Sequence, residues 1–121
     1  MAESQETTGK VYLFNTTNLR IRVFLNDNAL PPLAPAGNAN ESYAPSTMTV
    51  PRSDTTSVGD PVFATTNTMR VKFSGSSNTY ISVNVDPDQY PTNQDLLLYI
   101  FYDYMVLVGT TNMIIINQAP S

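Results

Sequence analysis

The sequence contains no histidine and no cysteine, and these two absences remove much of the chemistry that enzymes use. Histidine is the commonest general base and metal ligand, and cysteine supplies thiolate nucleophiles and zinc ligands. Without them the chain cannot build a Ser-His-Asp triad, a thiolate site or a structural zinc site from its own residues. We therefore expect a protein that is not an enzyme and that holds no cofactor.

Charge is also scarce. Charged residues make up 13% of the chain, and ten acidic residues outnumber six basic ones, which gives a net charge of −4. Globular proteins usually carry about twice that share of charge. The basic residues form no run, so we expect no binding to nucleic acid, which needs a basic footprint. Weak repulsion between copies favours self-association, so we expect a homo-oligomer.

Long apolar runs are missing as well. The longest, Leu96 to Val108, is interrupted by Asp103 and falls short of the roughly 20 apolar residues of a membrane-spanning helix. We therefore expect no transmembrane segment. The first residues, MAESQETTGK, lack the basic and apolar regions of a signal peptide. A cytoplasmic location is expected unless a leader has been removed or export follows an unconventional route.

What the sequence does contain is a series of short runs in which apolar and polar residues alternate. A period of two is typical of half-buried strands, and Gly, Pro and Asn separate the runs. The predicted strands are Val11–Asn15, Leu19–Leu25, Thr47–Val50, Met69–Phe73, Ile81–Val85 and Met113–Asn117. The pattern predicts an all-β fold, a small antiparallel β-sandwich or jelly-roll-like domain over residues 10–121, preceded by a polar N-terminal arm at residues 1–9.

The alternation also predicts which side chains face inward. The residues expected in the core are Ile21, Val23, Val71, Ile81, Val83 and Ile115. Those expected on the surface of their strands are Arg20, Arg22, Arg70 and Lys72. A shift of one residue in any strand would exchange the two sets.

The run Leu96–Val108 is apolar on both alternating faces. It is rich in Tyr, Ile, Phe and Val, which favours a strand, and the simplest interpretation is a central core strand that bends or turns at Asp103. In a second interpretation one of its faces meets another subunit. A third is a short helix before the strand, because Thr92 to Asp95 match a capping box.

Two groups of residues are candidates for binding. Asp86, Asp88 and Asp95 could supply oxygen ligands to Ca²⁺, although loop carboxylates more often serve turns. Phe24 and Tyr80 lie on the polar sides of their strands, where an aromatic side chain can contact a sugar or a protein. In the arm, the β-compatible residues Thr7 and Thr8 could pair with a neighbouring copy and so form part of an interface.

Three functions follow, in order of preference. The first is a structural or self-assembling protomer of a fibre, lattice, particle or inclusion, because charge is low and the strand edges carry few charges beyond Arg52. The alternative is a small lectin-like module that binds a glycan, with or without calcium. A second alternative is a component of a pore-forming or accessory toxin, which would use the apolar run.

Overall fold

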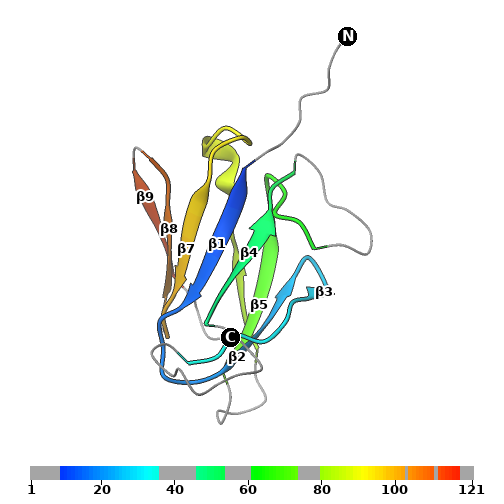
Figure 1. Ribbon diagram of the computed structural model, residues 1–121, viewed down its shortest axis with the longest axis vertical. Helices are drawn as coiled ribbons and strands as arrows, with labels where there is room; N and C mark the ends of the chain where they lie inside the picture. Colours follow the sequence, from blue (N-terminus) through cyan, green and yellow to red (C-terminus); the bar gives the residue numbers. More distant parts are fainter. Residues whose placement is uncertain are drawn as a thin grey trace.

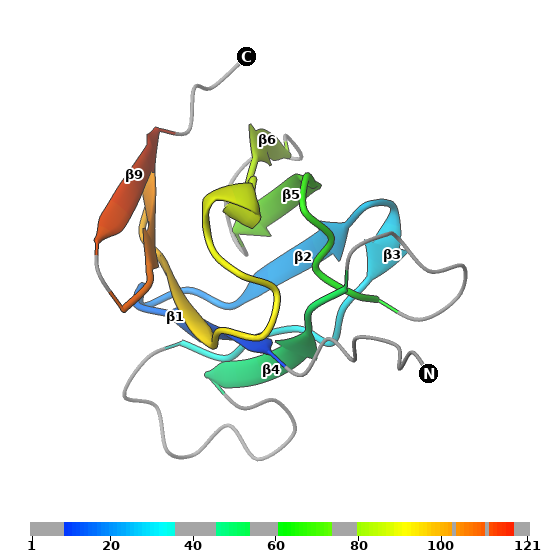
Figure 2. The ribbon, with the colours of Figure 1, turned by 90° about the horizontal axis from the view of Figure 1, so that it is seen from above.

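The chain folds into two β-sheets packed face to face, an all-β sandwich (Figures 1 and 2). The computed structural model describes residues 9–35, 46–53, 61–73, 80–102, 104–110 and 112–117. Thr7 and Thr8 of the predicted arm lie outside these residues. Within them, no helix is both long and apolar enough to cross a membrane.

The larger sheet has five strands in the order β4-β1-β7-β8-β9. The smaller sheet has four strands in the order β3-β2-β5-β6. The five strands are β4 (Thr47–Pro51), β1 (Lys10–Asn15), β7 (Leu96–Ile100), β8 (Tyr104–Val108) and β9 (Met113–Asn117). The four strands are β3 (Asn28–Ala29), β2 (Ile21–Leu25), β5 (Thr68–Phe73) and β6 (Ile81–Asn84). A single 3₁₀ turn, η1 (Pro87–Gln89), is the one helical element of the described chain.

The strands pair in antiparallel fashion with one exception. β1 runs parallel to β7, with Val11 beside Leu96 and Leu13 beside Leu98. This pairing joins segments about 85 residues apart, so local turn chemistry cannot specify it. It places β1 in the interior of the five-stranded sheet, between β4 and β7.

The core lies between the two sheets and follows the predicted alternation. Ile21, Val23, Val71 and Val83 are buried as predicted. Phe63 and Leu33, which form isolated bridges with Arg52 and Ile21, are also fully buried in this core. Arg20, Arg22 and Arg70 are exposed as predicted, whereas Lys72 is half-buried.

The apolar run Leu96–Val108 forms two strands rather than one. β7 and β8 pair as a hairpin, with Leu98 opposite Leu107, and the Phe101 N–H donates to the Tyr104 carbonyl across the turn. The strand interpretation and the turn are therefore confirmed, although Asp103 itself lies outside the described residues. The helix suggested by Thr92–Asp95 is absent from this described segment, because the chain makes a tight turn there in which the Gln94 N–H donates to the Pro91 carbonyl.

Two predicted core residues are corrected. Ile115 is 58% exposed, because β9 faces the core with Ile114 and Ile116 instead. The sequence of this strand is apolar at four consecutive positions, so alternation cannot set its phase. Ile81 points inward, next to Val71, but it is only half-buried because β6 is an edge strand.

A third expectation was wrong, because Arg52 is not an exposed charge at the edge of a sheet. It is 2% exposed, and its guanidinium lies under the connection from β6 to β7. Its Nη1 donates to the carbonyls of Pro91 (2.6 Å) and Gln94 (2.8 Å), and its Nη2 to those of Pro87 (3.2 Å) and Tyr90 (3.1 Å). One side chain thus holds the segment that crosses from one sheet to the other.

Candidate functional site

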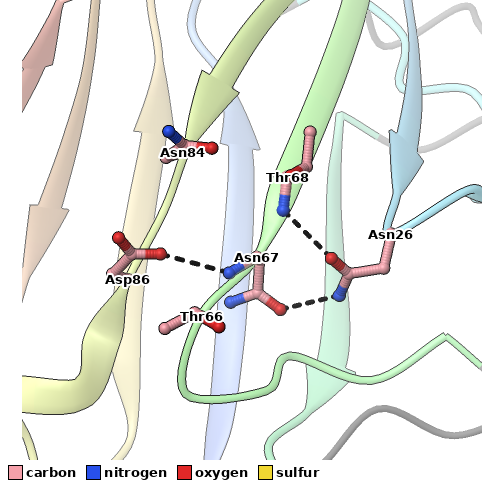
Figure 3. Close-up of a pocket in the computed structure, with 6 residues that line it drawn as sticks. All are labelled: Asn26, Thr66, Asn67, Thr68, Asn84 and Asp86. Carbon is pink, nitrogen blue, oxygen red and sulfur yellow. Dashed lines mark hydrogen bonds between the residues drawn. The ribbon is translucent and has the colours of Figure 1, made fainter.

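A polar pocket opens at one end of the four-stranded sheet, where β2 ends, β5 begins and β6 ends (Figure 3). Its volume is about 340 Å³. Every lining side chain carries an amide, a hydroxyl or a carboxylate. The lining residues are Asn26, Thr66, Asn67, Thr68, Asn84 and Asp86.

The turn after β2 supplies one wall of the pocket. Asn26 and Asp27 have φ angles of 50° and 69°, a left-handed conformation that Asn and Asp tolerate better than most residues. This turn brings the Asn26 amide beside β5. There its Oδ1 accepts the Thr68 N–H (3.0 Å) and its Nδ2 donates to Asn67 Oδ1 (2.8 Å) (Figure 3).

Asn67 forms the floor of the pocket and is only 4% exposed. Its Nδ2 donates to the carbonyls of Ala64 (2.9 Å) and Val85 (2.8 Å), and its Oδ1 accepts the Ala64 N–H (2.8 Å). Its backbone N–H donates to Asp86 Oδ1 (3.2 Å). Because these bonds fix the floor in the free protein, little order would have to be gained when a ligand binds.

The rim of the pocket is open to solvent. Thr66, Thr68, Asn84 and Asp86 are all exposed. Hydroxyls, amides and a carboxylate can donate to and accept from a ligand rich in hydroxyl groups. Asp86 is the one carboxylate among the six lining residues, so these residues cannot form the pair of carboxylates that a glycosidase needs.

Of these six residues, sequence reasoning singled out only Asp86, and for a different purpose. Asn84 alternates with Val83 and Val85 in a predicted strand, and this alternation places it on the polar side of that strand. Nothing in the sequence marks Asn67 as a pocket residue, because a buried asparagine with all its hydrogen bonds made cannot be told from any other loop asparagine by sequence alone.

The three predicted calcium ligands are used separately in the structure. Asp86 Oδ1 accepts the Asn67 N–H, and Asp95 Oδ1 accepts the Lys10 N–H (3.0 Å). Asp88 lies in the first turn of η1 and, with Asp86, lines a second hollow of about 300 Å³ on the side facing β9. Across the described residues, no three acidic side chains gather closely enough to hold a metal ion.

Beside the polar pocket, on the outer face of the same sheet, lies a group that we name the cation–aromatic cluster. It consists of Arg22, Phe24, Arg70, Lys72 and Tyr80. The two aromatic residues singled out from the sequence meet here edge to face, with ring centroids 5.7 Å apart. The Arg70 guanidinium lies 5.1 Å from the centroid of the Phe24 ring and 5.4 Å from that of Tyr80.

The outer face of the five-stranded sheet, unlike that of the four-stranded sheet, carries uncharged side chains along its paired strands. Two rows of uncharged side chains cross it in register from β4 to β9. One row is Thr47, Phe14, Tyr99, Val106 and Ile115, and the other is Thr49, Tyr12, Leu97, Val108 and Met113. Phe14 stacks on Tyr99 at 4.9 Å. Both rows are half-buried in the three middle strands and exposed at the two edge strands, where Met113 of β9 reaches 61% and Ile115 58%.

The four edges of the two sheets also differ. β3 has only two residues, β4 ends at Pro51, and β6 presents the polar residues Ser82 and Asn84. Short strands, proline and polar side chains are the usual protections of a sheet edge. β9, with the sequence MIIIN, contains no proline and no charged residue, and its only polar residue is the last one.

The chain matches no protein-family model, and comparisons with curated proteins and with solved structures find no similar protein. The function must therefore be argued from these surfaces alone.

Proposed function

We propose that this chain is a non-enzymatic, self-assembling β-sandwich protomer that joins a second copy of itself through β9. The observation that carries the proposal is the uncharged edge of that strand, with Met113 and Ile115 more than half exposed. Exposed apolar side chains in a continuous row mark association surfaces more often than isolated ones do. An unprotected edge adds a row of backbone groups able to pair with another strand.

Antiparallel pairing of two β9 strands about Ile115 is the arrangement that we favour. It sets the same surface against itself, as a two-fold axis requires. The outer apolar rows would then continue from one protomer into the next, and so would the sheet. No charged side chain lies in β9 to oppose the approach.

The proposed association can be tested by placing a charged side chain on the edge strand β9. Ile115→Lys points a cation from β9 into solvent and should leave the fold intact while making the protein monomeric. Ser82→Lys puts the same charge on β6, the exposed edge of the other sheet, and should leave the assembly unchanged. Sedimentation velocity of both variants and the parent gives the mass. A parent that is monomeric at its highest soluble concentration, or an assembly that survives Ile115→Lys, would overturn the proposal.

We extend the same proposal to the N-terminal arm. Gly9, where the described chain begins, is held by the Thr92 carbonyl and by the Arg52 N–H. Deleting residues 2–8 leaves this anchor in place and removes only the arm. Weaker assembly of the truncated chain supports a contribution from Thr7 and Thr8, and unchanged assembly assigns the contact to β9 alone.

The polar pocket supports a second function, binding of a carbohydrate. Its amides, hydroxyls and single carboxylate, held by the buried Asn67, suit the hydroxyl groups of a sugar. Asn84→Ala removes a rim amide without touching the floor. Loss of glycan-array binding in this variant, with binding retained by Ile115→Lys, would assign carbohydrate recognition to the pocket. An array on which the parent binds nothing contradicts it.

A further inference from the structure

We propose that the polar pocket and the cation–aromatic cluster form one extended site for an acidic oligosaccharide, a sugar chain that carries carboxylate or sulfate groups. The inference rests on the carbohydrate-binding function proposed above and names its ligand class. It draws on residues that lie outside the pocket.

The pocket and the cluster are continuous along β5. Thr68, Arg70 and Lys72 are alternate residues of this strand and share its outer side. Arg70 lies beside Ser82, and Thr68 lies beside Asn84 on the neighbouring strand. From Thr68 to Lys72 the strand rises roughly 13 Å, a length that suits a short chain of sugars better than a single ring.

The cluster supplies the cations. Arg22 lies opposite Lys72 across β2 and β5, and Arg70 lies opposite Phe24. The Lys72 Nζ is 5.6 Å from the centroid of the Tyr80 ring. The rings hold the side chains of Arg70 and Lys72 in place through cation–π contacts, which lowers the entropy lost when an anion binds. Carboxylate and sulfate groups form strong, charge-assisted hydrogen bonds with such donors.

Among the residues that the structure describes, the acidic Asp27 lies near Arg70 of the cluster and does not neutralise it. Asp27 Oδ1 is 3.9 Å from Arg70 Nη2, but the two side chains are 94% and 44% exposed. A pair so open to water interacts weakly and can be displaced. The remaining guanidinium donors of Arg70 can therefore serve a ligand.

The arrangement favours an acidic sugar over single-stranded nucleic acid. Bases stack on open ring faces, and the guanidinium of Arg70 covers a face of both Phe24 and Tyr80. Binding to a phosphate backbone grows with the number of cations, whereas this chain has a net charge of −4. A nucleic acid carries a phosphate at every unit and would set one beside Asp86, which would repel it, whereas a sugar chain can place neutral hydroxyls there and Asp86 can accept their hydrogen bonds.

The experiment is titration calorimetry with four probes: a uronic-acid tetrasaccharide, a sulfated tetrasaccharide, a neutral tetrasaccharide and oligothymidylate. We expect the acidic sugars to bind more tightly than the neutral one, and added salt to weaken only the acidic ones. The comparison between the two acidic probes distinguishes carboxylate from sulfate. Tightest binding of oligothymidylate would overturn the proposal in favour of nucleic acid.

Matched variants separate the two parts of the site. Arg70→Met with Lys72→Met should weaken the acidic probes about tenfold, as expected for the loss of charge-assisted bonds, and leave the neutral probe unchanged. Asn84→Ala should weaken all three sugars. Lys10→Met removes an exposed cation from the other sheet and should change nothing.

The outcomes also separate this inference from the carbohydrate function on which it rests. Equal binding of acidic and neutral sugars, or no effect of the Arg70 and Lys72 changes, overturns the acidic preference and leaves the carbohydrate function standing. No binding of any sugar overturns both.

Discussion

On the outer face of the four-stranded sheet Arg22 stands opposite Lys72, whereas on that of the five-stranded sheet Tyr99 stands opposite Val106. Both sheets bury the same kinds of aliphatic side chain between them. Burial of the shared core accounts for the fold, and it makes no demand on the outer faces. The two outer faces therefore differ for reasons other than the fold, and each carries one of our proposals: binding of an acidic sugar on the charged face and self-association on the apolar face.

The two sheets are joined by the β6–β7 connection, and the Arg52 side chain holds this connection in place. Replacing Arg52 therefore tests how much this contact stabilises the sandwich. Arg52→Met would remove the bonds from Arg52 to four backbone carbonyls of the β6–β7 connection. The carbonyls of Pro87 and Pro91 would keep a bond from a backbone N–H, whereas those of Tyr90 and Gln94 would lose their Arg52 donor. We expect the free energy of unfolding to fall by about 4 kcal/mol, since bonds from a charged donor are lost and buried acceptors are left unsatisfied.

Chemical denaturation measures the loss. Arg52→Lys is the matched control, because it keeps the charge but a single ammonium group cannot reach four carbonyls in the same geometry. It should fall between the parent and Arg52→Met. A loss below about 1 kcal/mol for Arg52→Met, the scale of a single ordinary hydrogen bond, would mean that the connection holds its shape by other contacts.

The two faces of the five-stranded sheet can be compared within one strand. Leu98 is fully buried in the core, and its neighbour Leu97 is half-buried on the outer face. Leu98→Ala should lower the free energy of unfolding by about 3 kcal/mol, because it removes buried methyl groups and leaves a cavity. Leu97→Ala should lower it by less than about 1 kcal/mol in the monomer. Similar losses for the two variants would show that the outer face is covered within the protomer.

How far the sequence predicted these faces depends on how cleanly each strand alternates. In β2 and β5 charged residues separate the apolar ones, so Ile21, Val23 and Val71 could be assigned to the core. In β9 every position that could set the phase is apolar, and Ile115 was assigned to the wrong side. β9 is also the strand of the proposed assembly edge, and its apolar outer side leaves the sequence without the alternation that would mark the inner side.

The candidate site was predictable only in part. Phe24 and Tyr80 could be identified because each interrupts a polar face. The pocket could not, since it forms where three strands and a loop meet and its floor, Asn67, depends on tertiary contacts to Ala64 and Val85. The same holds for the parallel pairing of β1 with β7, which no short-range pattern encodes.

The floor and the rim of the polar pocket should respond differently to truncation. Asn67→Ala removes two donated bonds and two accepted bonds, the latter from the Ala64 N–H and from Asn26 Nδ2, in a buried position. We expect a loss of about 2 kcal/mol in the free energy of unfolding, together with loss of sugar binding. Asn84→Ala, on the exposed rim, should weaken binding and change stability by less than about 0.5 kcal/mol. Equal stability losses in thermal or chemical unfolding would show that the rim is also structural.

The smallest change in stability is expected when calcium is removed. This measurement tests whether the polar pocket and the neighbouring acidic residues bind an ion. Asp86 and Asp95 already bind backbone N–H groups of different segments, the first that of Asn67 and the second that of Lys10. A ligand that binds only the folded protein raises the melting temperature, so a calcium site would be revealed by its removal. We expect EGTA to leave the melting temperature and sugar binding unchanged, and Asp88→Asn to behave like the parent.

A melting temperature that falls with EGTA and recovers with added calcium would instead mean that ion binding draws Asp86 and Asp88 together around the second hollow. The acidic preference of the neighbouring cluster would then have to be measured again with calcium present, because a bound cation can itself hold a carboxylated sugar.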